Sequence, residues 1–287
     1  MKKLFALPLV LVLTASFGYP AKINVSFAGG LARIDAGELV TGLQGQSDFI
    51  AKQFGATGGY SMPTTGLFYN QEISYFPFRH FGIGVGYGFF RMDKQTSAAY
   101  NVGQVAITES VTPDITVKPL TVNLHGLIFL SSWLHLDISA GVGSYATTVK
   151  WSDANTSTLG TFSGSEQYTF QAKQNLLGYQ GGLALEILIS PQFTFVLGAT
   201  GRYVRTNPLT SAAWTDQGKD MYGPFSASGN DHSLWAYTWT ADGVKYAQLA
   251  FQASAPSGSP SIGDIRTPRI NLSGLAATIG LKIVFDI

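Results

Sequence analysis

The sequence predicts an all-β protein, a transmembrane antiparallel up-and-down β-barrel with eight strands. Three observations support this class. The last thirteen residues, Leu275 to Ile287, alternate between apolar and small or polar residues, and a tilted transmembrane strand needs about 9 to 11. Charged residues are only 12% of the chain, while aromatic residues reach 13%. Because no stretch of about 18 uncharged apolar residues is present, a closed barrel is the remaining way to cross lipid.

The first residues have the features of a secretory signal peptide. A basic start precedes an apolar run from Leu4 to Leu13, and Ser16 and Gly18 fit the small-residue positions before a cleavage site. We therefore expect residues 1–18 to be removed and residues 19–287 to form one outer-membrane barrel domain. The apolar run is too short for a transmembrane helix, and the chain contains no Cys to carry a lipid anchor.

Alternating segments predict where the eight strands lie. In each segment an apolar face points to lipid and a polar or small face points to the lumen. The predicted strands cover approximately residues 21–34, 67–76, 81–92, 117–130, 134–147, 175–189, 193–204 and 275–287.

The connections between these strands alternate in length. Tight turns are predicted near Pro77, Ser131 and Pro191. They alternate with four long polar segments, residues 35–66, 93–116, 148–174 and 205–269. This alternation is typical of a barrel with short periplasmic turns, long extracellular loops and both termini in the periplasm.

The last long segment leaves the strand count open between eight and ten. Leu234 to Thr240 and Val244 to Phe251 flank a turn sequence, Ala241-Asp242-Gly243, which signals a hairpin. If both segments crossed the membrane, the barrel would have ten strands. Because the first segment is short and rich in aromatic residues, we expect an extracellular hairpin instead.

The predicted lumen contains ionisable residues of both signs. They are Glu72, His125, His135, Asp137, Glu186, Arg202 and Lys282, with Asp286 at the end of the last strand. Charges held away from water must pair or stay hydrated. Two interpretations are open. One is a satisfied polar core that fills the barrel, and the other is a gate or narrow conduit whose charges exchange partners.

Turn lengths also predict which residues lie opposite one another in the lumen. The turn at Pro191 places Gln180 opposite Arg202, and the turn after Phe76 places Glu72 opposite Gly84. Gly84 belongs to a row of alternate glycines from Gly82 to Gly88. These glycines either admit bulky inward side chains from other strands or leave a gap beside Glu72.

We expect no catalytic, cofactor or metal site. Asp231-His232-Ser233 contains the residue types of a catalytic triad, but neighbours on an extended chain diverge, so a solvated turn is expected. His125 and His135 lack a third metal ligand at a suitable spacing. The formal net charge of +1 gives no reason to expect a nucleic-acid partner.

Aromatic residues of the last long segment are the candidates for contact with an extracellular ligand. They are Trp214, Trp235, Tyr237 and Trp239. Such residues can anchor an interface, and they can equally pack a small core within the loop itself.

The architecture resembles the small outer-membrane proteins of the OmpA-barrel, OmpX and OmpW type. The resemblance rests on the signal peptide, the alternating strands, the three tight turns, the four long loops and the final strand Gly280-Leu281-Lys282-Ile283-Val284-Phe285-Asp286-Ile287. In that group the barrel-assembly machinery recognises the last strand, which typically ends in an aromatic residue. Here the last residue is Ile287 and the aromatic residue is Phe285.

The resemblance implies a location in the bacterial outer membrane, with outer-membrane lipid, lipopolysaccharide and the assembly machinery as partners. Our first functional hypothesis is a narrow passive conduit or binding barrel for small molecules, hydrophobic ones included, as in OmpW. The alternative is a structural or adhesive surface protein acting through its long loops, as the OmpX-like closed core implies. A lipid-modifying enzyme is a distant third, and we expect no enzymatic activity.

Overall fold

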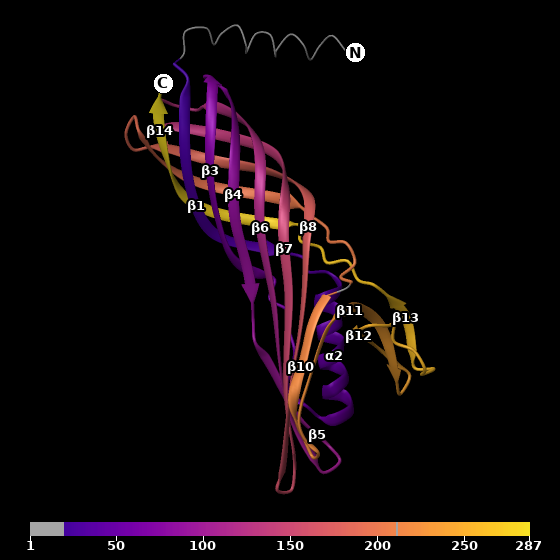
Figure 1. Cartoon of the computed structure of the whole chain (residues 1–287). Coiled ribbons are helices and arrows are strands. Elements are labelled where there is room, and N and C mark those ends of the chain that lie inside the picture. Colours follow the sequence, from indigo (N-terminus) through magenta and orange to yellow (C-terminus); the bar gives the residue numbers. More distant parts are fainter. Residues whose placement is uncertain (1–19, 211) are drawn as a thin grey trace.

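The computed structural model describes residues 20–210 and 212–287. The predicted signal peptide, residues 1–18, lies outside the described residues and stays a prediction. Figure 1 shows a barrel that continues at one end into an elongated sheet with a helix beside it. Among the described residues, no helix is long and apolar enough to cross a membrane.

Eight strands form the ring of the barrel. They are β1 (Lys22–Ile34), β3 (Thr65–Phe78), β4 (Phe81–Asp93), β6 (Val105–Phe129), β7 (Leu134–Leu159), β8 (Phe162–Leu188), β9 (Phe193–Tyr203) and β14 (Gly274–Asp286). Each strand pairs antiparallel with the next. The last strand, β14, pairs along its whole length with β1, which closes the ring. The predicted fold class and the eight membrane strands are confirmed.

The hairpin of the last long segment lies outside the ring, as expected. It consists of β11 (Gly223–Ala241) and β12 (Val244–Gln252), and β12 pairs with β11. A short strand, β13 (Ile262–Arg266), pairs with the other edge of β11. The ten-strand alternative is therefore wrong.

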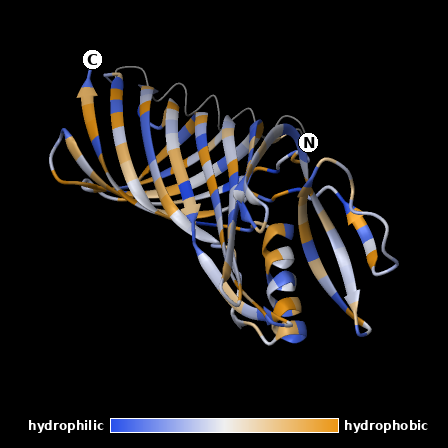
Figure 2. Cartoon of the chain, turned by 60° about the horizontal axis from the view of Figure 1, so that its bottom comes forward, coloured by the Kyte–Doolittle hydropathy of each residue, from blue (hydrophilic) through white to orange (hydrophobic). Residues whose placement is uncertain are grey.

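The outer surface of the barrel is apolar. Figure 2 shows apolar and polar residues alternating along its strands. Outward residues such as Ile73 (61% exposed) and Leu183 (55% exposed) would be unfavourable in water and suit a lipid environment. Exposed aromatic side chains lie near the tight turns, where a membrane boundary is expected: Tyr75, Phe81, Trp133, Phe193 and Phe285.

The two ends of the barrel differ. We call the end with the three tight turns the turn end, and the opposite end the loop end. β6, β7 and β8 are 25, 26 and 27 residues long, far more than a membrane crossing needs. At the loop end, β5 (Thr96–Val102) pairs with β6, and β10 (Ala212–Asp220) pairs with β8 and β11.

The prediction of loops at residues 93–116 and 148–174 is therefore largely wrong. These segments continue the barrel strands as a sheet, because the alternation of inward residues does not stop at the membrane. Val111, Ile115, Val149 and Trp151 occupy the inward positions and are buried. Polar residues that suggested a loop, such as Lys150 and Lys173, lie on the outward face of the same strands.

One helix completes a hydrophobic core at the loop end. Helix α2 (Glu38–Phe54) lies within the predicted loop 35–66, ahead of the two-residue strand β2 (Thr57–Gly58), and ends at Gly55 in the left-handed conformation. Its buried side chains belong to the same core as the inward residues of the extended sheet. At Gly45 the helix approaches the backbone of Ala247 so closely that a Cβ atom would collide with it.

Replacing Leu281 or Val122 with Arg should destabilise the barrel by about 2 to 4 kcal/mol, because both side chains face lipid within the part of their strands that forms the barrel. Folding titrations in lipid vesicles measure this change. Val244→Arg, at the exposed turn of the β11–β12 hairpin, is the matched control and should cost little. Equal tolerance at Leu281 and Val244 would contradict the lipid-facing assignment.

Candidate functional site

Five ionisable side chains meet in the middle of the lumen. They come from five strands and are Glu72 (β3), His125 (β6), Asp137 (β7), Glu186 (β8) and Lys282 (β14). All are 3–9% exposed. The strand registers bring them to one level. For example, Ser26 of β1 pairs with Glu72 on one side and with Lys282 on the other. We call these five residues the lumen cluster.

Charges of opposite sign alternate along the lumen cluster. His125 lies between two carboxylates, with Nε2 2.8 Å from Oε1 of Glu72 and Nδ1 3.0 Å from Oδ2 of Asp137. Ionised carboxylates only accept hydrogen bonds, so this arrangement suits the doubly protonated imidazolium. The Nε2 contact has the distance of an ion pair but lies outside hydrogen-bond geometry.

Lys282 completes the charged path. Its Nζ donates to Oε1 of Glu186 and lies 3.6 Å from Oδ2 of Asp137. The order across the lumen is therefore Glu72, His125, Asp137, Lys282 and Glu186. Each cation contacts two carboxylates: His125 contacts Glu72 and Asp137, and Lys282 contacts Asp137 and Glu186.

Neutral side chains extend the network toward the loop end. Nδ2 of Asn123 donates to Oε2 of Glu72 at 2.5 Å, and Nε2 of Gln180 donates to Oδ1 of Asn123 at 2.8 Å. The hydroxyl of Tyr145 donates to Oε1 of Gln180 at 3.2 Å. This continuous path of hydrogen bonds favours the first of the two interpretations, a polar core that fills the barrel.

The row of glycines on β4 makes room for this network. A Cβ atom at Gly84 would collide with the carboxylate of Glu72, and one at Gly86 would collide with the hydroxyl of Thr121. The predicted register is wrong by two residues, since Glu72 pairs with Gly86 rather than Gly84. The reason is that β3 continues to Phe78, so that the turn consists of Arg79 and His80 alone, with a one-residue irregularity between Tyr75 and Phe78.

Arg202 does not belong to the lumen cluster, although the alternation of its strand predicted that it would lie in the lumen with these residues. It lies opposite Gln180, as expected, but this position is nearer the loop end than the carboxylates. Its guanidinium lies 4.6 Å from the ring centre of Phe90 and 5.7 Å from that of Phe68. Among the described residues it has no ion-pair partner, so aromatic rings take the place of a carboxylate.

The other two predicted lumen residues also lie apart from the lumen cluster. Asp286 is exposed at the rim of the turn end, where its Oδ1 is 3.4 Å from Nζ of Lys22. His135 is near the same end and packs edge-on against Phe129, with ring centres 4.4 Å apart. His135 is therefore not a second partner for the carboxylates that His125 contacts.

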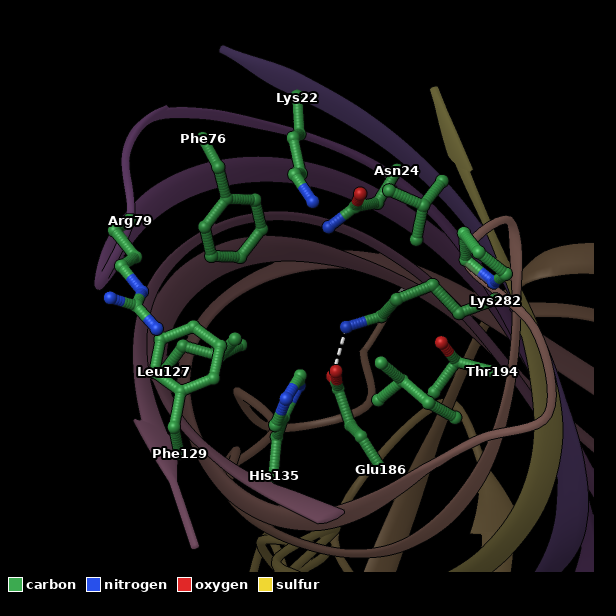
Figure 3. A pocket seen from close by; sticks show the side chains of 13 residues that line it. Lys22, Asn24, Phe76, Arg79, Leu127, Phe129, His135, Glu186, Thr194 and Lys282 are labelled. Carbon is green, nitrogen blue, oxygen red and sulfur yellow. Dashed lines mark hydrogen bonds and ion pairs between the residues drawn. The ribbon is translucent and has the colours of Figure 1, made fainter. Parts of the chain in front are cut away.

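Free space in the lumen is divided. A cavity of about 110 Å³ adjoins the lumen cluster, one of about 70 Å³ opens at the turn end, and one of about 30 Å³ lies beside Arg202. Figure 3 shows the turn-end cavity with the Lys282–Glu186 pair at its inner side. Toward the loop end the barrel is filled by an apolar core that includes Tyr145, Phe90 and Val204, each at most 1% exposed. The lumen is thus blocked by side chains.

A second ionisable group, which the sequence did not indicate, lies in the loop-end sheet. Glu109 is 8% exposed and accepts a hydrogen bond of 3.1 Å from the hydroxyl of Tyr100. Burial and the neighbouring Glu109 raise the pKa of Asp153 to about 8. Burial, with Glu109 as the next cause, also raises the pKa of Tyr100 and Tyr60. Only the pairing of β5, β6 and β7 brings these residues together.

The aromatic candidates for ligand contact make contacts within the loop-end part of the chain. Trp214 donates a 2.8 Å hydrogen bond to Asp231 and stacks on His232. Nε1 of Trp235 donates to the carbonyl of Gln252 at 3.1 Å. Trp239 packs edge-on against Phe49 of α2, and burial raises the pKa of Tyr237. These contacts favour the interpretation in which the residues pack the loop's own core.

The segment Asp231-His232-Ser233 lies in β11 and is not the solvated turn that we expected. His232 pairs with Ala212 of β10 and Ser233 pairs with Gln252 of β12, so the side chains of His232 and Ser233 point to opposite faces. Asp231 lies at an irregularity in the β10–β11 pairing. Nδ1 of His232 is 2.9 Å from the hydroxyl of Tyr168. These three residues therefore do not converge as acid, base and nucleophile. Within residues 20–210 and 212–287, no group of three or more His, Asp or Glu side chains is arranged to hold a metal ion.

Several solved structures are similar to this chain, including three that are covered almost completely by it. A major outer membrane protein from Thermus thermophilus is 12% identical, with 92% of this chain and 99% of that chain covered and a TM-score of 0.36. Neisserial surface protein A is 8% identical, with 92% and 99% covered and a TM-score of 0.34. The outer membrane protease OmpT from Escherichia coli is 10% identical, with 94% and 98% covered and a TM-score of 0.32.

No protein-family model matches the sequence, and no match is found among curated proteins. Because the three TM-scores are low, we base the class of the protein on its own structure. An eight-stranded antiparallel ring closed by β1 and β14, apolar outside and polar within, is the architecture of an outer-membrane β-barrel.

Lys282→Met should destabilise the barrel by about 3 to 5 kcal/mol, because it leaves Glu186 and Asp137 buried without their shared cation. Adding Glu186→Gln should restore much of this loss, since the two residues are coupled. Unfolding in detergent or lipid compares the single and double variants. Lys150→Met, on the exposed face of β7, is the control. Additive losses in the double variant would contradict the coupling.

The stability of the loop-end sheet should fall as the pH rises from about 4 to about 8. In this window folded Asp153 keeps a proton that the unfolded chain, with an ordinary pKa near 4, has released. Asp153→Asn should flatten this dependence, while Asp48→Asn, on the exposed face of α2, should not. Urea unfolding followed by tryptophan fluorescence from pH 4 to 9 tests this. A slope unaffected by Asp153→Asn would assign the dependence to other groups.

Proposed function

We propose that this protein is a surface-binding protein of the bacterial outer membrane, in which the barrel is the anchor and the loop-end sheet is the functional part. The observation that carries the proposal is the unbroken course of β6, β7 and β8 from the barrel into that sheet. About 15 residues of each strand lie beyond a membrane crossing, a length of about 50 Å. Continuous strands hold the distal end rigidly away from the membrane.

In this proposal the turn end faces the periplasm and the loop end faces the outside of the cell. Short turns and long loop-end segments support this orientation. β1 begins at Lys22 and β14 ends at Asp286, and these two paired residues lie at the turn end. Outer-membrane lipid surrounds the apolar belt, lipopolysaccharide surrounds the loop-end half of the barrel, and the barrel-assembly machinery inserts the chain.

The distal end of the sheet carries a group of exposed apolar side chains. Three hairpin turns end there at nearly the same level, because Ala106 pairs with Thr158 and Ser165 pairs with Lys219 (Figure 1). Their exposed apolar residues, which we call the apolar tip, are Val102, Leu159, Met221 and Tyr222. Tyr222 is 90% exposed and Met221 is 70% exposed. The contacts of the four candidate aromatic residues are internal, so we assign binding to the apolar tip.

Cells that display the protein should adhere more strongly to a hydrophobic polymer surface than cells without it, and the double change Met221→Ser and Tyr222→Ser should remove the difference. The reason is that this change eliminates the most exposed apolar area of the tip. Retention of fluorescent cells under flow measures adhesion, with clean glass as the hydrophilic surface.

The matched control for this experiment is Val244→Ser. Val244 is exposed at a different hairpin turn, so this variant should adhere like the unmodified protein. Surface display of each variant is checked with an antibody. If the tip variant adheres as strongly as the unmodified protein, the apolar tip is not the contact surface.

The divided lumen gives less support to the conduit hypothesis. Passage would require both the lumen cluster and the apolar core near Tyr145 to move. We therefore propose a barrel that is closed at rest.

Planar-bilayer recordings of the unmodified protein should show little steady conductance, because side chains block the lumen at two levels. Lys282→Met should add brief openings by removing the cation that joins Asp137 and Glu186. A large steady conductance that Lys282→Met leaves unchanged would reject the closed barrel and favour an open channel.

A further inference from the structure

The inner wall of the barrel carries a group of apolar side chains at the turn end, where a polar wall is the rule for a lumen that meets water. The inward positions next to the mouth hold Phe76, Leu127, Phe129, Leu188 and Val284, which we call the apolar collar. These side chains line the turn-end cavity and are partly or wholly buried. Neither the membrane anchor nor the loop-end sheet requires apolar residues at this place.

Polar groups meet the same cavity from its inner side. The Lys282–Glu186 pair forms part of its wall, and both side chains are almost fully buried. Asn24 also lines the cavity and is only 6% exposed, yet its side-chain oxygen has no hydrogen-bond partner. A buried amide oxygen without a donor is uncommon in folded proteins, and the same side chain also carries an NH2 group that can donate hydrogen bonds.

Two cationic side chains stand at the rim. The guanidinium of Arg79 lies 4.6 Å from the ring centre of Phe129, and among the described residues it has no carboxylate partner. Lys22 stands on the other side of the mouth, with its Nζ 3.4 Å from Oδ1 of Asp286. Figure 3 shows the nitrogen ends of Lys22 and Asn24 close together at one side of the cavity, and Arg79 beside Phe129.

We propose that the turn-end cavity binds a small anionic amphiphile, a compact apolar body that carries one carboxylate or phosphate group. The apolar collar contacts the body, Arg79 and Lys22 attract the anionic group, and the side-chain NH2 of Asn24 can donate a hydrogen bond to it. The guanidinium of Arg79 lies over the Phe129 ring, and its N–H groups can donate to an oxyanion. The cavity of about 70 Å³ limits the ligand to few atoms, since one water needs about 10 to 15 Å³ on this measure.

Benzoate is the first probe, because it combines a planar apolar body with one carboxylate. The full-length protein is placed in nanodiscs of zwitterionic lipid, and binding is measured by calorimetry and by ligand-observed NMR. We expect benzoate to bind, benzylammonium of the same shape and opposite charge not to bind, and acetate to bind at least tenfold more weakly. Equal binding of benzoate and benzylammonium would overturn the proposal, as would no binding of benzoate.

Arg79→Gln should weaken benzoate binding about tenfold, because it removes a charged hydrogen-bond donor. Arg79 is exposed at a turn, so the barrel should still fold. Arg33→Gln makes the same charge change at the other end of the barrel and should leave benzoate binding unchanged. Phe129→Ala tests the apolar collar with the charges intact, and it should also weaken binding. Binding that is the same in all three variants would overturn the proposed site.

The anionic group could come from a soluble molecule or from a lipid headgroup of the surrounding leaflet. Nanodiscs that contain phosphatidylglycerol distinguish these sources. If the lipid phosphate occupies the cavity, the apparent affinity for benzoate falls in these nanodiscs and the fall is lost in Arg79→Gln. If the affinity is unchanged, the site takes soluble anions. Both results support the site, and they are independent of adhesion by the apolar tip.

Discussion

The pairing of β14 with β1 is the contact on which the rest of this structure depends. Within lipid no water can satisfy backbone N–H and C=O groups, so a sheet can cross only as a closed ring. The pairing runs from Lys22↔Asp286 to Ile34↔Gly274 without interruption. Closure gives every strand one face toward lipid and one toward the lumen. The apolar outer surface and the lumen cluster therefore both follow from one alternation, because neighbouring residues of a strand point to opposite faces.

The same alternation serves two different environments along one strand. On β7 the inward positions hold Asp137 within the barrel, then Tyr145, and then Val149 and Trp151 in the loop-end sheet. In the barrel the polar face is inward and the apolar face meets lipid. Beyond the membrane the inward face becomes an ordinary hydrophobic core covered by α2, and the outward face meets water. The loop-end sheet can thus be rigid without any break between it and its anchor.

The sequence predicted the parts of the fold that depend on alternation and turn signals, and it missed those that depend on register. Eight ring strands, the three tight turns, the extra hairpin and the opposition of Gln180 and Arg202 follow from local patterns. The alternation along each strand also predicted which residues face the lumen: Glu72, His125, Asp137, Glu186 and Lys282. It could not show that Arg202 lies among aromatic rings, because that depends on its height in the barrel relative to Phe90. The inward apolar residues of 93–116 and 148–174 carried a strand signal that their polar neighbours obscured.

The Lys282–Glu186 pair separates the two larger cavities of the lumen, since both residues line the turn-end cavity and the cavity beside the lumen cluster. A buried ion pair loses the hydration of both charges, and its partners must compensate. Asp137 provides part of that compensation from the inner side, at 3.6 Å from Nζ of Lys282. An anionic group held by Arg79 and Lys22 would lie at the rim, on the side of this pair away from Asp137. The Lys282–Glu186 pair therefore belongs both to the wall of the proposed binding cavity and to the lumen cluster, although the mouth and the distal apolar tip are at opposite ends of the molecule.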